Sequence, residues 1–371
     1  MRDAKIEKQT GQHTERIFHL LCREKELTKQ EIAAKLQMSM PTALQNINLL
    51  LENGFLQECG TAGSTGGRRA KKICLNPQAG YSVGINIALH GTDIALTDLL
   101  GNVLRMQTFP QVFCDEPIWY EQFSRQLDGF LQGTGKIVGA CISFPGIVDM
   151  QAGLLMRSHI FGLEHISLNR FFRAIPYPAM VENDANCACF AELTAQRDTY
   201  LYLSLNRSVG GAVMYHGGLL AGRSFQAGEF GHMLLVPGGK PCYCGKNGCA
   251  DAYLSPDVLG MPVETFFHHM EADQPDAMEK WQEYLNYLAI LVTNLRMAMD
   301  FDIILGGTMG IWVKQYFTDL CKKAAQYDRF ARDVDYLIPC TCAEEACAAG
   351  AAKLALERYA NRLLEDQKEI L

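Results

Sequence analysis

The sequence predicts an α/β protein whose main body has two similar halves and follows a small, mostly helical head. Three observations support this fold class. Segments with strand-like and helix-like patterns alternate through the body, and a similar strand pattern begins at residue 81 and again at residue 200. The length of 371 residues also exceeds what one hydrophobic core usually supports, so we expect two or three domains.

The composition is that of a folded chain and excludes several other classes. With 48% hydrophobic and 20% charged residues, it is not collagen-like, coiled-coil or wholly disordered. No apolar stretch approaches the roughly 18 residues of a membrane span. Residues 1–8 are charged and lack the apolar core of a signal peptide. We therefore expect a cytoplasmic protein without membrane contact, whose fourteen cysteines are reduced thiols or metal ligands.

The net charge of −7 is unevenly distributed along the chain. Residues 1–75 contain twelve basic and eight acidic side chains, whereas the remainder contains 22 basic and 33 acidic ones. A basic head on an acidic body suggests that only the head meets a polyanion such as DNA.

The head is predicted to contain short helices followed by a hairpin. After a first amphipathic helix, Thr28 and Glu31 form a capping box at the start of a second helix. A tight turn follows, and Ser39 is placed to cap a third helix that runs to about Glu52. An Asn-Gly pair ends this helix, and a strand begins near Phe55. This order of elements predicts a winged helix-turn-helix.

The outer face of the third helix carries short polar side chains suited to base edges in a major groove. The hairpin then supplies four cations within five residues, placed to contact phosphates or a minor groove. The DNA contacts that we expect are Thr42, Gln45, Asn46, Arg68, Arg69, Lys71 and Lys72. The alternative is a small protein-interaction module with a solvated basic hairpin.

Each half of the body is predicted to open with three consecutive antiparallel strands, a weak internal duplication. The predicted strands are 82–87, 92–96 and 103–108 in the first half and 200–205, 211–216 and 219–220 in the second. Helices are expected at 185–193 and 281–299, between further buried strands. Such an α/β body is expected to bind a ligand in the cleft between its halves.

A metal site is predicted in a glycine-rich stretch. His232, Cys242, Cys244 and Cys249 have the spacing His-x9-Cys-x-Cys-x4-Cys. One imidazole and three thiolates complete the tetrahedron of a structural zinc ion. The alternative is a set of buried thiols beside an unrelated histidine.

A second set of cysteines provides an internal comparison. Cys340, Cys342 and Cys347 have the same cysteine spacing, but Phe330 stands where the histidine would be, and no histidine follows His269. We therefore interpret these three as small buried residues rather than a second metal site.

Four segments together resemble the ROK family (repressors, open reading frames and kinases) over nearly the whole chain. They are Ser-Phe-Pro-Gly-Ile-Val-Asp at 143–149, Val-Glu-Asn-Asp-Ala-Asn at 181–186, the stretch 231–249 with the metal ligands, and Leu-Gly-Gly at 305–307. The resemblance implies an actin-like, sugar-kinase-type body of two lobes behind the winged helix-turn-helix.

The resemblance also implies a division into domains. The head would comprise residues 1–75, and the first lobe residues 79–183 together with about 354–371. The second lobe, 184–353, would carry the zinc site and a dimerisation surface.

The family's sugar-binding positions correspond here to Asn183, Asp184, Glu229, His232 and Asp251. Carboxylates and an amide can each bind two sugar hydroxyls. In kinases of the family the position of Asp184 is the general base, and in repressors the same carboxylate would only hold the sugar. Residue 251 is usually glutamate, so Asp251 is one methylene shorter. For Asn183 or Asp184, the alternative is a helix N-cap.

Two loops indicate that the chain is a binding protein rather than an enzyme. Kinases of this fold need an Asp-x-Gly-x-Thr type turn, which is Asn-Ile-Ala-Leu-His here, at 86–90. The second phosphate loop, at 206–211, retains only its trailing glycines. We therefore predict a sugar-responsive transcriptional regulator of the repressor kind, with zinc as cofactor. Its partners would be operator DNA, a sugar or sugar phosphate, and a second copy of the chain.

Two other classes of function stay open at this stage. The first is an ATP-dependent sugar kinase with an appended DNA-binding domain. The second is a purely structural zinc protein, which would show no thermal shift with sugars.

Overall fold

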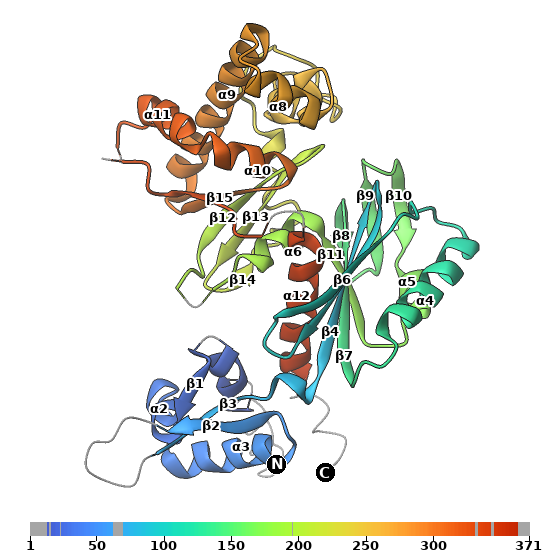
Figure 1. Cartoon of the computed structure of the whole chain (residues 1–371), viewed down its shortest axis with the longest axis vertical. Helices are drawn as coiled ribbons and strands as arrows, with labels where there is room; N and C mark the ends of the chain where they lie inside the picture. Colours follow the sequence, from blue (N-terminus) through green and yellow to red (C-terminus); the bar gives the residue numbers. More distant parts are fainter. Residues whose placement is uncertain are drawn as a thin grey trace.

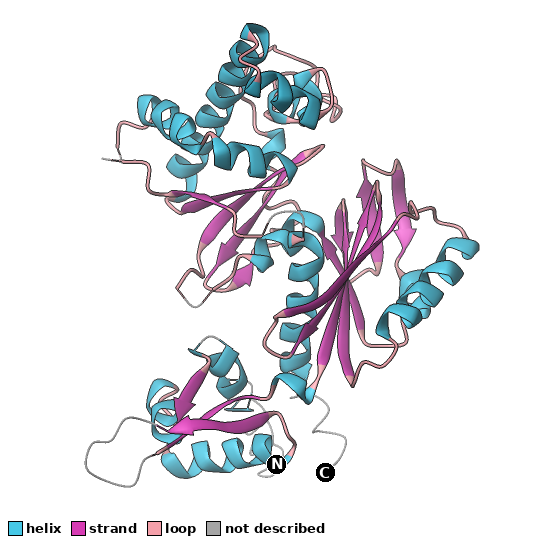
Figure 2. Cartoon of the chain, in the orientation of Figure 1, coloured by secondary structure: helices cyan, strands magenta, loops and turns pink. Residues whose placement is uncertain are grey.

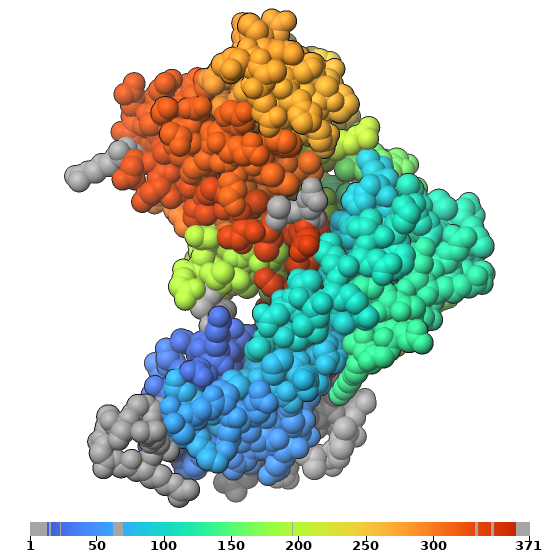
Figure 3. All heavy atoms as spheres, viewed as in Figure 1, coloured from blue at the N-terminus to red at the C-terminus, as the bar shows by residue number. Residues whose placement is uncertain are grey.

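The computed structural model consists of a small head and two larger lobes, each lobe built on a five-stranded sheet (Figures 1 and 2). It describes residues 13–14, 16–22, 24–61, 70–194, 196–330, 333–342 and 345–362. The head lies at one end of the molecule against the first lobe, and the second lobe lies at the opposite end (Figure 3). Within the described residues, no helix has the length and apolar character to span a bilayer.

The head combines helices with a three-stranded sheet. Residues 16–22 are helical and are followed by β1 (Glu26–Thr28), α2 (Lys29–Lys35), α3 (Met40–Glu52), β2 (Leu56–Thr61) and β3 (Lys71–Leu75). The capping box is confirmed, because Thr28 Oγ1 accepts from Glu31 N at 3.2 Å and the Glu31 carboxylate accepts from Thr28 N at 2.7 Å. Strand β1, which the sequence did not predict, pairs with β3.

Lobe 1, as we call the part built on the first large sheet, has the strand order β11-β7-β4-β5-β6. A turn of 3-10 helix at Pro77–Ala79 leads into it from the head. Its strands are β4 (Tyr81–Ala88), β5 (Gly91–Asp98), β6 (Val103–Phe109), β7 (Ile137–Phe144) and β11 (Ala179–Asn183). A smaller sheet contains β8 (Ile147–Asp149), β9 (Leu154–Ser158) and β10 (Leu163–Ser167). Helices α4 (Pro117–Leu131) and α5 (Asn169–Ala174) bury aromatic side chains against the large sheet.

Lobe 2 is built on the second large sheet, of order β14-β13-β12-β15-β16. Its strands are β12 (Tyr200–Leu205), β13 (Val209–Tyr215), β14 (Gly218–Leu219), β15 (Asp302–Gly306) and β16 (Leu337–Pro339). Its helices are α7 (Asp251–Leu254), α8 (Val263–Glu271), α9 (Pro275–Met299), α10 (Thr308–Gln315) and α11 (Phe317–Tyr327), with 3-10 turns at Phe230–His232 and Pro256–Leu259.

The internal duplication expected from the sequence is confirmed. In each large sheet, three consecutive antiparallel strands are followed by two parallel ones. The α/β class of the body is therefore also confirmed. Between the two sheets lie α6 (Asp184–Ala191) and α12 (Ala346–Arg362), which share a hydrophobic cluster with both (Figure 1).

The last helix, α12, packs with unusually close backbone approaches. A Cβ atom added to Gly84 in β4 would lie 1.8 Å from the carbonyl oxygen of Ala348. A Cβ added to Gly350 would lie 1.8 Å from the carbonyl oxygen of Cys187 in α6. Both contacts are to backbone atoms, which cannot swing away as a side chain can. Glycine at these two positions therefore sets the spacing between the sheet of lobe 1, α12 and α6.

The far end of α12 contacts the head. Leu356 and Ala360 are buried in one cluster with head residues such as Ile17 and Leu50. The rings of Phe55 and Tyr359 lie 6.2 Å apart. The head is thus docked on lobe 1 through an apolar surface that includes α12, rather than tethered by the linker alone.

We expect Gly84→Ala to reduce the free energy of unfolding by about 1–3 kcal/mol or more, because the new methyl group overlaps a backbone carbonyl. Gly129→Ala is the matched control, since Gly129 is exposed on α4 with nothing within 4 Å of an added Cβ. That control should gain about 0.5–1 kcal/mol from its higher helix propensity. Chemical denaturation of the full chain measures both, and equal stability of the two variants would contradict the close packing.

Candidate functional site

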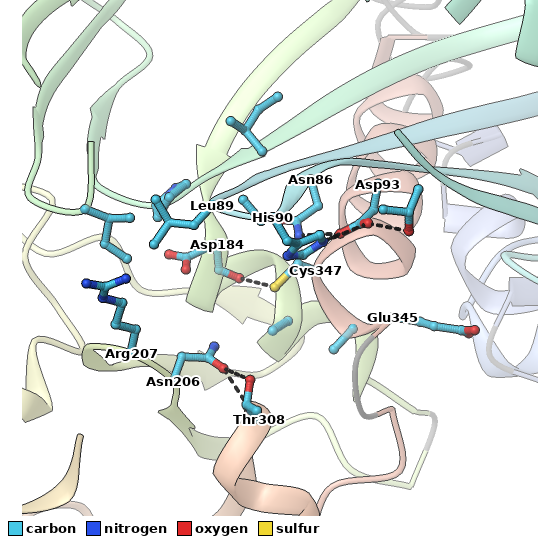
Figure 4. A pocket seen from close by; sticks show the side chains of 18 of the residues that line it. Asn86, Leu89, His90, Asp93, Asp184, Asn206, Arg207, Thr308, Glu345 and Cys347 are labelled. Carbon is cyan, nitrogen blue, oxygen red and sulfur yellow. Dashed lines mark hydrogen bonds and ion pairs between the residues drawn. The ribbon is translucent and has the colours of Figure 1, made fainter. Parts of the chain in front are cut away.

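A cavity of about 710 Å³ lies between the two lobes (Figure 4). Its walls come from the β4–β5 hairpin of lobe 1, the first turns of α6 and α12, and the loops that follow β12 and β15. Polar side chains from all of these elements face it. Among them are Asn86, His90, Asp93, Asp184, Asn206, Arg207 and Thr308.

On the lobe 1 side, the polar side chains are hydrogen-bonded to one another. Asp93 stands opposite Asn86 in the β4–β5 register and is 5% exposed. Its carboxylate accepts hydrogen bonds from Asn86 Nδ2 at 3.0 Å and from Thr108 Oγ1 at 2.8 Å, and His90 Nε2 lies 3.1 Å away. Sequence reasoning missed Asp93, although a lone acid in a predicted buried strand was a signal for it. The β4–β5 hairpin therefore presents the Asp93 carboxylate and its hydrogen-bond partners to the cavity.

On the lobe 2 side, the start of α10 is capped by a protein side chain. Asn206 Oδ1 accepts from Thr308 N at 2.8 Å and from Thr308 Oγ1 at 3.0 Å. Free amides at a helix N-terminus are a common binding site for phosphate. Here Asn206 occupies one of them, and Arg207 faces the cavity beside it (Figure 4).

Asn183 and Asp184 lie where β11 ends and α6 begins. Asn183 is the N-cap of α6, since its Oδ1 accepts from Asn186 N at 3.1 Å, and its Nδ2 donates to Gly146 O at 2.9 Å. The N-cap alternative is thus confirmed for Asn183, which leaves its side chain largely engaged. Asp184 lines the cavity, and burial raises the pKa of its carboxyl group.

Glu229 and His232 approach Asp184 from lobe 2. Burial, and then the negative charge of Asp184, raise the pKa of the Glu229 carboxyl group. A Glu229 carboxylate oxygen lies 3.9 Å from His232 Nε2. Asp184 thus links the cavity to the Glu229–His232 pair, although Glu229 and His232 are not themselves among the residues that line it. Carboxylates so placed can accept hydrogen bonds from a polyol.

Asp251, which was expected to contact a sugar, is instead buried and bonded to the backbone. It is 5% exposed, and its Oδ1 accepts from the backbone N of Val209 at 2.6 Å. Its carboxylate therefore fixes the start of β13 instead of facing the cleft. The shorter side chain gives the physical reason, because the position of a glutamate carboxylate lies one methylene further out.

The four predicted metal ligands form one compact group. The ligand atoms of His232, Cys242, Cys244 and Cys249 all lie within 4.8 Å of one another. Cys242 Sγ is 3.7 Å from His232 Nδ1, and Cys244 Sγ is 3.7 Å from Cys249 Sγ. The group could hold a metal ion. Nδ1 of His232 faces this group while Nε2 faces Glu229.

The loop around this group is held by its own backbone. Cys242 N donates to Lys246 O at 2.8 Å, and Lys246 Nζ donates to His232 O at 2.9 Å. Gly248 has φ of +85°, and a Cβ there would lie 1.7 Å from Val236 O. Only glycine fits this position, which explains the glycine before the last cysteine.

The second cysteine set forms no such group. In the part of the chain that the structure describes, the four residues above are the single cluster of this kind. Cys340 is buried, whereas Cys342 and Cys347 are half-buried. Cys347 lines the cavity beside Asp184, so it is more accessible than the sequence analysis expected.

The residues expected to contact DNA differ in their exposure and in their ion pairs. Gln45 is exposed on α3, and Thr42 is half-buried. The expectation that Asn46 contacts DNA is wrong. Its side chain is 1% exposed, and its Nδ2 donates to Thr42 O at 2.8 Å. The buried face of α3 therefore extends beyond its apolar residues. Lys71 is paired with Glu58, and Lys72 with Glu26. Arg68 and Arg69 lie outside the described residues.

The chain is similar in sequence to a known protein family. The ROK family model matches residues 82–358. The xylose repressor of Bacillus subtilis (strain 168) is 26% identical over 65% of this chain and 66% of its own length, so the match spans just under two thirds of that relative.

Two solved structures share the fold. A ROK family transcriptional regulator, a homolog of the Escherichia coli MLC protein, has a TM-score of 0.80 at 18% identity over 96% of this chain and 99% of its own. The ROK hexokinase from Thermus thermophilus has a TM-score of 0.62 at 24% identity, and the match covers 74% of this chain and 98% of the hexokinase. The actin-like, sugar-kinase-type fold is thereby confirmed.

We expect Asp184→Asn to raise the melting temperature of the ligand-free chain at pH 7. Because the folded-state pKa lies above the unfolded value of about 3.9, the chain loses stability as the pH rises from the unfolded pKa to the folded-state pKa, and the full cost of the ionised carboxylate remains above it. The gain should therefore be small near pH 4 and grow as the pH rises. Calorimetry across this range measures it, and Asp128→Asn, exposed on α4, is the control that should change little at any pH. A destabilised Asp184→Asn variant at pH 7 would contradict the expectation.

Proposed function

The chain belongs to the ROK family, and we propose on that premise that it is a sugar-responsive transcriptional regulator of the repressor kind. The observation that carries this proposal is a head with two helices and a hairpin, docked on the helix that borders the interlobe cavity. The likeness to the transcriptional regulator, which extends over 96% of the chain, supports it. The hexokinase match, over 74%, supports the two-lobe body alone.

Each part has a proposed role. Residues 1–75 form a winged helix-turn-helix that binds operator DNA. Residues 79–183, together with about 354–371, form the first lobe. Residues 184–353 form the second, which carries the metal site and a dimerisation surface. A sugar or sugar phosphate binds between the lobes.

The proposed sugar-binding residues are Asn183, Asp184, Glu229 and His232. The proximity of Asp184 to Glu229 supports this set, because two carboxylates can together accept hydrogen bonds from several hydroxyl groups. Asp251 would act on the site indirectly, by fixing Val209.

We propose that the chain does not transfer phosphate from ATP. The Asp93 carboxylate would repel a phosphate near the first loop, and Asn206 already caps the helix at the second. The alternative, an ATP-dependent sugar kinase with a DNA-binding head, is supported by the shared fold and by the kinases among the sequence relatives, whose matches cover half of this chain or less.

A thermal-shift panel of pentoses, hexoses, their N-acetylated amines and their phosphates tests the proposal directly. At least one of these should raise the melting temperature of wild type. Asp184→Asn should need about tenfold more of that sugar for the same shift, because one hydrogen-bond acceptor that carries charge is lost. Asp128→Asn should behave as wild type. Sugar-dependent ATP turnover by wild type that Asp184→Asn abolishes would favour the kinase instead.

We also propose that the metal is zinc. Zinc prefers a tetrahedron of thiolates and imidazole with Zn–S bonds of about 2.3 Å, which places sulfur atoms about 3.8 Å apart. The 3.7 Å separation of Cys244 Sγ and Cys249 Sγ agrees with this spacing. The ion would tie His232 to the loop that carries the three cysteines.

Wild type should contain one zinc per chain, and Cys249→Ser should lower both the zinc content and the melting temperature, because structural zinc contributes folding free energy. Elemental analysis and calorimetry measure the two. Cys342→Ser, in the cysteine set without a histidine, is the matched control and should retain the metal. Metal-replete wild type without zinc would refute the assignment.

On this hypothesis Gln45 reads a base, so Gln45→Ala should cost about 1–3 kcal/mol of discrimination between a promoter duplex that wild type selects from a random-sequence pool and a scrambled duplex. Lys71→Gln with Lys72→Gln should weaken both duplexes similarly and reduce the salt slope by about 0.9 per lost phosphate contact. Fluorescence anisotropy measures both effects. Asn46→Ala, by contrast, should lower stability because that side chain is buried.

The regulator should bind a two-fold symmetric operator as at least a dimer, since one head offers little surface for tight specific binding. Sedimentation at micromolar concentration, with and without operator, measures this. A monomer in both conditions would refute the dimer, and equal affinity for promoter and scrambled duplex would refute sequence-specific binding.

A further inference from the structure

Tyr243, which stands between two of the metal-binding cysteines, makes a contact across the cleft. Its ring stacks on the ring of His159 in lobe 1, with centroids 3.8 Å apart and planes at 24°. The same ring meets His232 edge-on, with centroids 5.2 Å apart and planes at 78°. Tyr243 thus connects a metal ligand of lobe 2 to a side chain of lobe 1.

The backbone segments that carry His159 and Tyr243 are each held in place by hydrogen bonds. His159 directly follows β9, where Ser158 is 1% exposed and its Oγ donates to Pro145 O at 2.6 Å. On the other side, Cys242 N donates to Lys246 O, and Pro241 pairs with Asn247 in a β-bridge. Because neither ring is carried on a long free loop, their separation depends on the placement of the lobes.

We propose that the stacking of Tyr243 on His159 is a latch that holds lobe 2 closed against lobe 1 beside the sugar-binding residues. The metal-binding loop is its fixed half. Glu229 lies 3.9 Å from His232, whose ring touches Tyr243, so the latch adjoins the proposed sugar-binding carboxylates. The part of the proposal that concerns sugar rests on the proposed function, whereas the closure of the lobes does not.

The latch predicts a direct effect on ligand affinity. An effector that contacts both lobes binds the closed form, and its apparent dissociation constant is the intrinsic one divided by the closed fraction. A single aromatic stack lost from the closed form changes the closed-to-open ratio by about three- to tenfold. Apparent affinity should fall by up to the same factor.

Small-angle X-ray scattering of the zinc-loaded full chain, without sugar or DNA, tests the latch. Tyr243→Ala and His159→Ala should each increase the radius of gyration at an unchanged oligomeric state, and the double variant should be no more open than either. Tyr243→Phe should match wild type because the stacking ring is kept. Tyr215→Ala is the matched control, since Tyr215 is similarly exposed but stacks on Phe301 within lobe 2.

Zinc content is measured on every variant. If Tyr243→Ala loses zinc, His159→Ala decides, because it breaks the stack from lobe 1 without altering the metal loop. An unchanged radius for His159→Ala overturns the latch. If the lobes open in these variants while no sugar shifts wild type in the thermal panel, the latch stands and the proposed sugar response fails.

Discussion

The close packing of α12 against β4 at Gly84, and against α6 through its own Gly350, is the constraint on which the rest of the structure depends. With no side chain at either glycine, the helix backbone contacts both the sheet of lobe 1 and α6 directly. Its seventeen residues extend about 25 Å at 1.5 Å per residue. Cys347 at one end lines the cavity, and Tyr359 near the other touches Phe55 of the head. One helix therefore borders both the interlobe cavity and the head.

The charges around the cavity suit the neutral form of the proposed effector, a free sugar, better than its phosphate. Burial raises the pKa values of Asp184 and Glu229, so both carboxylates gain from hydrogen-bond donors that replace lost water. Sugar hydroxyls supply such donors, while a phosphate would add charge of the same sign. Arg207 is a cation on the lobe 2 wall, but Asp93 opposes it from lobe 1. Asn206 occupies the backbone amide of Thr308 at the start of α10, and the lobe 1 wall carries the Asp93 carboxylate.

The sequence predicted those features that depend on local pattern. The opening strands, the capping box at Thr28 and the compact group of one histidine and three cysteines follow from alternation, cap chemistry and ligand spacing, which neighbouring residues determine. Strand β1 was missed because its three residues have no pattern of their own and exist through pairing with β3. The burial of Asp251 also depends on tertiary packing, since its carboxylate bonds to a strand 42 residues away. The bond of Asn46 to Thr42 O is local, so that bond does not explain why only 1% of Asn46 is exposed; the rest of the head must cover this face of α3. Polar residue type alone does not reveal which face is covered.

The head, lobe 1, α12 and lobe 2 all line one junction cavity, through which a movement of lobe 2 would be transmitted to the head. A cavity of about 200 Å³ is lined by Phe18 of the head, Leu99 of lobe 1, Leu193 beyond α6, Gly217 of lobe 2 and Leu356 of α12. The head and α12 are packed together in one cluster, whereas Gly217 belongs to the β13–β14 turn of the other sheet. A rotation of lobe 2 about α12 therefore changes the volume of this cavity and the apolar area buried in it. Since buried apolar area contributes about 25 cal/mol per Å², a change of a few tens of Å² at this junction is comparable to the coupling energies that regulate binding proteins.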